Sequence, residues 1–317
     1  MQKRKLGSSG LETAPLVLGG NVFGWTADEP TSFAILDAFV DAGFNMIDTA
    51  DIYSFWAPGN QGGESETVIG NWLKKRGGRD KVLIGSKVGY EMSPTQRGLK
   101  RSYILKTVEE SLKRLKTDYI DLYQSHIDDP DTPVDETLEA HAQLVRQGKA
   151  RFIGASNFGA PRLKESLETS RKKGHPRYQT LQPLYNLSDR KDFEAELEPL
   201  CVEEGLGVIT YFSLASGFLT GKYRSEKDLE GKSRAGEVKK HMTPRGQKIL
   251  AALDEVARKH EVKQGQIALA WLLARPSVTA PISSATSLDQ LAELIEATRI
   301  KLDRGSIAAL DKASAWR

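Results

Sequence analysis

Four ionisable residues follow short apolar runs of the chain, where they could take part in chemistry. Asp48 and Tyr53 come after one run, Lys87 closes a second and His126 closes a third. A carboxylate, a phenol, an ammonium and an imidazole brought together can hold and transfer a proton. The set favours proton transfer over acyl transfer, since the sequence contains no G-x-S-x-G turn and no evident Ser/His/Asp triad.

Charge predicts how these side chains would act on one another. A lysine that ends a buried strand loses its hydration, so it requires an anionic neighbour or a lowered pKa, and Asp48 could supply the anion. We expect this pair to bring a cation near Tyr53, which would lower the pKa of the phenol and make it a proton donor. A neutral His126 could hydrogen-bond a substrate oxygen and orient the reacting group.

Each of these residues also has a purely structural interpretation. Asp48 could cap the turn before the next helix, Lys87 could extend to solvent, and Tyr53 could be a loop aromatic. His126 could be a hydrogen-bonded histidine at a strand end. We favour the chemical interpretation because all four residues follow apolar runs of the same kind.

Metal chemistry has little support in the sequence. A metal-dependent hydrolase would require several His and carboxylate ligands at strand ends, and only His126 and Asp48 qualify. The single cysteine, Cys201, excludes an intramolecular disulfide and a zinc site built from cysteines. We therefore expect no metal in this protein.

Eight strand-like apolar runs alternate with amphipathic helical segments. The runs begin near Leu16, Asn45, Val82, Tyr119, Ala150, Gln179, Gly207 and Val278. Helical spacing recurs in the segments Lys100–Leu115 and Val134–Val145. A strand followed by a helix, repeated in this way, requires parallel pairing, and eight repeats can close a barrel. An open doubly wound sheet is the alternative, but the turn after the first run lacks the G-x-G-x-x-G spacing that opens a dinucleotide-binding helix.

Four segments fall outside the repeat. Arg4 to Leu11 reads as a small hairpin that could plug the amino-terminal mouth of a barrel. A long charged segment runs from Ser213 to about Met242, and helices are expected over Pro244–His260 and Asp303–Ser314. The predicted fold is thus an α/β protein, a (β/α)₈ TIM barrel with an N-terminal hairpin, a long loop after strand seven and two extra helices.

Composition narrows the partners and the compartment. The 317 residues carry 45 basic and 42 acidic side chains, mixed along the chain, so we expect no nucleic-acid partner. The amino terminus lacks an apolar signal core and no long uncharged apolar run occurs, so we expect no membrane partner and a cytoplasmic location. No heptad seam or exposed strand indicates an oligomeric state.

Several motifs resemble those of the aldo-keto reductases, in the order expected for that superfamily and over nearly the whole chain. They are NMIDTADIY, LKRSYILKTVEESLKRLKTDYIDLYQSH, GKARFIGASNF, LQPLYNL and YFSLASGFLTGKY. The resemblance implies one barrel domain over residues 1–317 that reduces aldehydes or ketones to alcohols. It also implies a catalytic tetrad of Asp48, Tyr53, Lys87 and His126, with Tyr53 as the acid and a nicotinamide dinucleotide as hydride donor.

The same resemblance implies a cofactor site along the barrel mouth. Its residues would be Gly20, Asn21, Asp48, Ser156, Asn157, Gln182, Tyr211, Phe212, Ser213, Leu214, Ala215, Lys222, Arg234, Ser284, Thr286, Gln290 and Glu293. Tyr211 would stack on the nicotinamide, and Lys222 with Arg234 would bind the phosphates. Unlike many relatives, this chain has no cation near Thr286 or Gln290. Hydroxyl and amide donors at a helix start still favour NADP(H), with NAD(H) as the alternative.

Aromatic side chains in the first two loops suit an apolar or ring-shaped carbonyl substrate. Trp25, Phe55 and Trp56 are the expected substrate contacts, although ordinary loop packing would also explain them. A second hypothesis is a regulatory or channel-subunit-like module that holds the cofactor and turns over slowly, as some relatives of this fold do.

Overall fold

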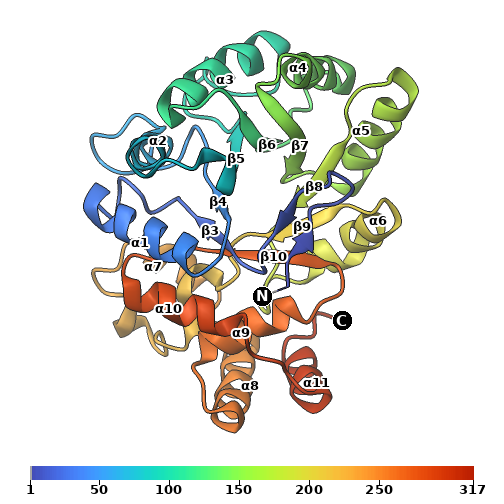
Figure 1. The fold of residues 1–317 in the computed structure, drawn as a ribbon. Coiled ribbons are helices and arrows are strands. Elements are labelled where there is room, and N and C mark those ends of the chain that lie inside the picture. Colours follow the sequence, from blue (N-terminus) through green and yellow to red (C-terminus); the bar gives the residue numbers. More distant parts are fainter. Residues whose placement is uncertain (1) are drawn as a thin grey trace.

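The structure, a computed structural model, describes residues 2–317. Eight parallel strands close into a barrel in the order β10-β3-β4-β5-β6-β7-β8-β9, with helices around it (Figure 1). The strands are β3 (Val17–Gly19), β4 (Met46–Asp48), β5 (Leu83–Val88), β6 (Ile120–Ser125), β7 (Ala150–Ser156), β8 (Tyr178–Gln182), β9 (Gly207–Thr210) and β10 (Val278–Ser283). The chain therefore folds as a (β/α)₈ TIM barrel, and each strand lies where an apolar run predicts it.

Nearly every residue of these eight strands is buried, because the sheet is covered on both faces. The helices cover the outer face, and the barrel interior is filled by side chains from several strands. This interior cluster comprises Leu6, Val17, Met46, Leu122, Ile209, Ala280 and Ile282. An alternating pattern, which a sheet with one wet face would show, is accordingly absent from these eight runs.

The surrounding helices all bury apolar side chains. They are α1 (Glu29–Asp41), α2 (Glu64–Arg76), α3 (Arg101–Leu115), α4 (Val134–Arg146), α5 (Ala160–Lys173), α6 (Glu198–Glu203), α9 (Gln264–Leu273) and α10 (Leu288–Ala297). In α3, Ile104, Val108, Leu112 and Leu115 are buried, which is the spacing that predicts this helix. None of the helices in residues 2–317 is both long enough and apolar enough to cross a membrane.

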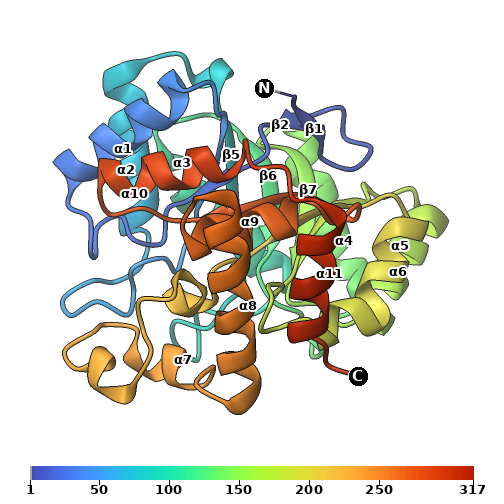
Figure 2. The same cartoon turned by 90° about the horizontal axis from the view of Figure 1, so that it is seen from below.

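The amino-terminal hairpin closes one end of the barrel, as predicted. Its strands β1 (Arg4–Lys5) and β2 (Glu12–Thr13) pair antiparallel, and Figure 2 shows them at the end opposite α7 (Ala235–Lys239). Leu6 joins the interior cluster, and the Ser8 amide donates a 3.1 Å hydrogen bond to Gln179 at the start of β8. The carboxyl ends of the strands are left as the open end.

The segment after β9 is more ordered than a loop. Two 3₁₀ turns, Ala215–Thr220 and Glu226–Leu229, precede α7. Apolar side chains anchor it, because Phe218, Leu219, Leu229 and Val238 are all buried. The predicted long segment after strand seven is thus present, and it contains short helical turns that its sequence did not indicate, because its buried apolar anchors show no regular period.

Two further helices pack outside the ring. They are α8 (Pro244–His260) and α11 (Arg304–Ala313), and both were predicted within one residue. Their starts explain this accuracy, since Thr243 accepts a hydrogen bond from the Gly246 amide and Asp303 accepts one from the Ser306 amide.

Candidate active site

A buried ion pair joins the ends of two neighbouring strands. Asp48 is the last residue of β4, and β5 carries Lys87 beside it. The Lys87 side chain is completely buried, yet its ammonium has three acceptors: Asp48 Oδ2 at 2.6 Å, the Thr49 carbonyl oxygen at 2.8 Å and the Tyr53 hydroxyl at 2.8 Å. All three ammonium donors are thus satisfied.

The phenol of Tyr53 lies between this ion pair and open space. Its hydroxyl accepts from Lys87 and donates to Asp48 Oδ2 at 3.2 Å. Burial first, and the Asp48 charge second, raise the pKa of Tyr53 well above its ordinary value. The expected lowering is therefore wrong for the protein alone, because Asp48 already neutralises the cation. Tyr53 is consequently protonated at neutral pH, which a proton donor requires.

His126 follows β6 at the edge of the same space. Its ring centre is 6.1 Å from that of Tyr53. Burial, with a smaller contribution from the Lys87 charge, lowers the pKa of His126 well below its ordinary value, so the imidazole is neutral. Neutrality is the condition under which we expected it to hydrogen-bond a substrate oxygen.

A cleft of about 1090 Å³ extends from these residues across the open end of the barrel. Tyr53 and His126 line it, whereas Asp48 and Lys87 lie buried behind them. Most of the predicted cofactor contacts line the same cleft: Asn21, Ser156, Asn157, Gln182, Tyr211, Phe212, Ser213, Leu214, Lys222, Arg234, Ser284, Thr286, Gln290 and Glu293. The structure thus brings together residues that are up to about 270 positions apart in sequence.

Three predicted cofactor contacts do not line the cleft: Asp48, which is buried behind it, Gly20 and Ala215. Gly20 is buried and donates its amide to the Asp48 carbonyl oxygen at 2.8 Å, and Ala215 is 1% exposed. Their neighbours Gly19 and Ser216 line the cleft instead. The structure therefore does not bring these three residues to the opening. For Gly20 and Ala215, the motif locates the turn but does not show which of its residues faces the cleft.

Hydrogen bonds connect the ends of β7, β8 and the turn after β9. The Asn157 amide donates to the His126 carbonyl oxygen at 2.9 Å, and its carbonyl oxygen accepts from the Tyr211 hydroxyl at 2.7 Å. Gln182 donates to Asp48 Oδ1 at 2.9 Å, and Ser156 donates to the Gln182 carbonyl oxygen at 2.9 Å. These polar side chains therefore form one network with the ionisable residues.

The far end of the cleft contains a cation that the sequence did not reveal. Lys263, just before α9, lines the cleft with Thr286 and Gln290, and its ammonium is 2.5 Å from Glu293. It is more than 20 positions from these residues in sequence, so no local motif connects them. This corrects the expectation that the chain has no cation at that end.

Two tryptophan side chains form a connected group beside Tyr53. Trp56 lines the cleft with its ring centre 6.0 Å from that of Tyr53, and Trp25 packs edge-on against Trp56 at 5.7 Å. Trp25 and Phe55 do not line the cleft, so only Trp56 keeps its predicted substrate position. Tyr90, which the motifs did not single out, lines it with its ring 5.1 Å from that of His126.

A closed parallel barrel with an ionisable cluster and a large cleft at the carboxyl ends of its strands defines a barrel enzyme. Among residues 2–317, no cluster of three or more His, Cys, Asp or Glu side chains could hold a metal ion. Comparison with known proteins then identifies the class.

The family model "Aldo/keto reductase family" matches residues 15–315. The chain is 36% identical to an oxidoreductase named YrpG of Bacillus subtilis, over 98% of this chain and 95% of the relative. It is 33% identical to the L-glyceraldehyde 3-phosphate reductase of Escherichia coli, over 94% and 87%. It is also 33% identical to a probable voltage-gated potassium channel subunit beta of Oryza sativa, over 94% and 91%. The protein belongs to the aldo/keto reductase family and is an oxidoreductase.

Proposed function

We propose that this protein reduces aldehydes or ketones to alcohols with NADPH, and that Tyr53 gives the proton to the carbonyl oxygen. The observation that carries the proposal is the protonated phenol at the cleft, hydrogen-bonded from behind by a buried ammonium. The bound dinucleotide would supply the hydride, and this chain would supply the proton and the orientation of the substrate.

The side chains divide that work. As Tyr53 loses its proton, the Lys87 ammonium 2.8 Å away stabilises the phenolate, and Asp48 keeps the ammonium in position. The neutral imidazole of His126 donates to the same carbonyl oxygen and holds it near the phenol. Trp56 and Tyr90 line the cleft beside these two residues, where their half-exposed rings would shield a bound substrate from part of the solvent.

The residues along the cleft fit a dinucleotide. Tyr211, with its hydroxyl fixed by Asn157, offers a flat ring near Tyr53 for a nicotinamide. Lys222 and Arg234 line the middle of the cleft and form no ion pair within residues 2–317, so they are free for phosphates. The start of α10 and the Lys263 ammonium, at the far end, suit the additional phosphate of NADPH.

A cofactor-holding module with slow turnover is the second candidate, and the likeness to a potassium channel subunit supports it. The protonated Tyr53 with its ammonium neighbour favours turnover. A small carbonyl compound is the proposed substrate, and the proposal includes no nucleic acid or membrane partner and a cytoplasmic location.

The test is NADPH oxidation by the protein across a panel of aldehydes, ketones and sugars. Wild-type protein should oxidise NADPH with at least one class, and Tyr53→Phe should lose that activity while NADPH still quenches tryptophan fluorescence. Tight NADPH binding without turnover on any substrate would favour the module, and retained activity in Tyr53→Phe would refute the proton assignment.

A further inference from the structure

The turn after β9 is strained at the residue that follows Tyr211. Phe212 has a φ of +49°, a left-handed conformation that a bulky side chain rarely adopts. Ala215 and Ser216 are left-handed as well, with φ of +48° and +56°. Such strain persists only where the surrounding structure enforces it, so other residues must hold this turn.

Asn186 holds this turn by a hydrogen bond from its side chain. It is completely buried, and its amide donates a 3.0 Å hydrogen bond to the Phe212 carbonyl oxygen and a 2.8 Å bond to Asp189 Oδ2. Its carbonyl oxygen accepts from the amides of Ser188 at 2.7 Å and Asp189 at 3.0 Å. Both donors and both acceptor positions of the side chain are used, so it cannot turn away from Phe212.

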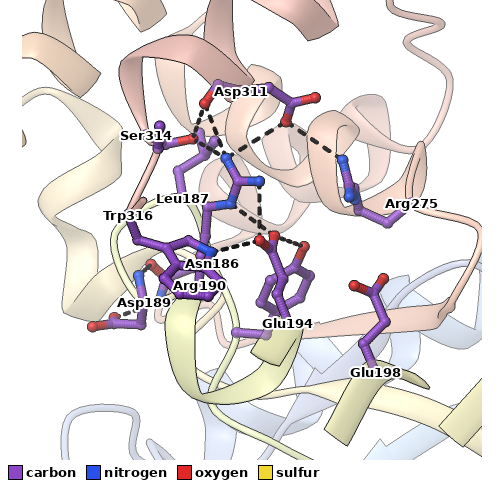
Figure 3. Close-up of polar contacts among 12 residues, drawn as sticks. Asn186, Leu187, Asp189, Arg190, Glu194, Glu198, Arg275, Asp311, Ser314 and Trp316 are labelled. Atoms are coloured by element: carbon purple, nitrogen blue, oxygen red, sulfur yellow. Dashed lines mark hydrogen bonds and ion pairs between the residues drawn. The ribbon is translucent and has the colours of Figure 1, made fainter. Parts of the chain in front are cut away.

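The loop that carries this asparagine is itself fastened to the carboxyl-terminal segment (Figure 3). Arg190 forms two hydrogen bonds with Glu194, at 2.7 and 3.1 Å, and donates to the Asp311 carbonyl oxygen and Ser314 Oγ. Glu194 also accepts from Trp316 Nε1 at 2.8 Å. The loop therefore cannot shift unless the end of the chain moves with it.

A second arginine also joins this loop to the carboxyl-terminal segment. Arg245, from the first turn of α8, donates to the carbonyl oxygens of Ser188 at 2.7 Å and Ser314 at 2.5 Å. The loop is thus held by α8, α11 and the residues after α11. None of these elements lines the cleft, so the support comes from outside the site.

We propose that Asn186 is a positioning residue for the dinucleotide. It holds Phe212 in the left-handed conformation and so keeps the ring of Tyr211 at the cleft, and the segment from Asp311 to Trp316 supports it through the two arginines. Tyr211 is otherwise fixed by the bond of its amide to the Pro183 carbonyl oxygen, at 3.0 Å, and by its hydroxyl. The inference rests on the proposed function, because NADPH is the molecule positioned.

The experiment measures the NADPH dissociation constant by quenching of tryptophan fluorescence, without any carbonyl substrate. Asn186→Ala should weaken NADPH binding about tenfold, as expected for one buried hydrogen bond that holds a strained turn. The exchange Asn186→Asp/Asp189→Asn keeps a donor–acceptor pair between these two residues and loses the donor to Phe212, so it should weaken binding similarly, and it serves if the alanine variant does not fold. Unchanged affinity would overturn the inference.

A double-mutant cycle separates positioning from general stability. Glycine adopts a left-handed φ without strain, so in Phe212→Gly the turn no longer depends on Asn186. Adding Asn186→Ala to Phe212→Gly should then weaken NADPH binding by less than about twofold. An equal loss of affinity in both backgrounds would overturn the proposed route through Phe212.

Asn45→Ala is the matched control. Asn45 also holds backbone groups, those of Ala14 and Glu12, but at the closed end of the barrel. It should lower the melting temperature and leave NADPH affinity unchanged; a comparable loss of affinity would show that any lost asparagine bond has this effect and would overturn the inference. If wild-type protein does not bind NADPH, the proposed function fails; if it binds and Asn186→Ala binds equally well, only this inference fails.

Discussion

The ammonium of Lys87 lies 2.8 Å from the hydroxyl oxygen of Tyr53 and is completely shielded from water. Burying an unpaired cation lowers the free energy of unfolding, and here Asp48 pairs with the ammonium. The ion pair therefore contributes both to stability and to the proposed reaction. The same contact that stabilises a phenolate also keeps the ends of β4 and β5 together.

Lys87→Met should therefore affect both properties. We expect carbonyl reduction to fall by roughly 10²–10⁴-fold, the range typical of lost acid–base assistance. We also expect the free energy of unfolding to fall by about 3–5 kcal/mol, because Asp48 is left as an unpaired buried charge. Denaturant unfolding of the double variant Asp48→Asn/Lys87→Met should recover part of that loss, and a further loss would contradict this account of the ion pair.

Lys263→Ala should change cofactor preference. Loss of the cation should weaken NADPH binding about tenfold and leave NADH binding nearly unchanged, because NADH lacks the additional phosphate. Glu293→Gln should act in the opposite direction, since it removes the carboxylate that pairs with this lysine. Lys259→Ala, which breaks an exposed pair with Asp303, is the control. Equal effects on both dinucleotides would rule out contact with that phosphate.

Trp56→Ala should impair substrates that carry a ring more than short aliphatic aldehydes. The indole lines the cleft beside Tyr53, so its removal takes away an aromatic contact and should raise KM for benzaldehyde about tenfold. Affinity for NADPH should not change. Phe55→Ala removes a neighbouring ring that lies outside the cleft and should leave both constants unaltered; a similar rise in KM there would argue for general disturbance of the loop.

His141 should make the fold sensitive to acid. Its imidazole is completely buried beside Ser125, and burial lowers its pKa from 6.5 to about 4. The unfolded chain therefore takes up a proton at a higher pH than the folded chain does, so stability is full above about pH 6.5 and is lost as the pH falls towards 4. Between pH 7 and pH 5 this group alone should cost about 2 kcal/mol.

The matched variant is His141→Gln, which cannot take up this proton. Urea unfolding at pH 7 and pH 5 should show a smaller decrease in stability for the variant than for the wild type. Identical decreases in the two proteins would mean that other groups cause the acid sensitivity.

Much of this architecture could be predicted from the sequence, because local signals determine it. Apolar runs located the eight strands, and the two outer helices were predicted within one residue; in the structure Thr243 and Asp303 cap their starts. Strand ends also identified Asp48, Lys87 and His126, since parallel strands bring their carboxyl ends to one face. Contacts between segments that are distant in sequence could not be predicted. Lys263, for example, reaches the far end of the cleft because α9 packs against α10, and no local motif describes that packing.

The direction of the Tyr53 pKa was wrong for a related reason. The sequence shows that a cation and an anion flank the phenol, but not which effect prevails. In the structure the two charges neutralise each other, and removal from water then dominates. Trp25 and Phe55 do not line the cleft in the structure, and residue type alone does not show which side of a loop faces the opening.

Within residues 2–317, β1, β2 and Leu6 close the amino-terminal end of the barrel, and the cleft lies at the opposite end, where both a dinucleotide and a carbonyl compound would have to enter. When two molecules enter through the same cleft, the one that binds deeper must bind first and leave last. In the proposed reaction, the two molecules should therefore bind in a fixed order, and release of the more deeply bound one should be the slowest step.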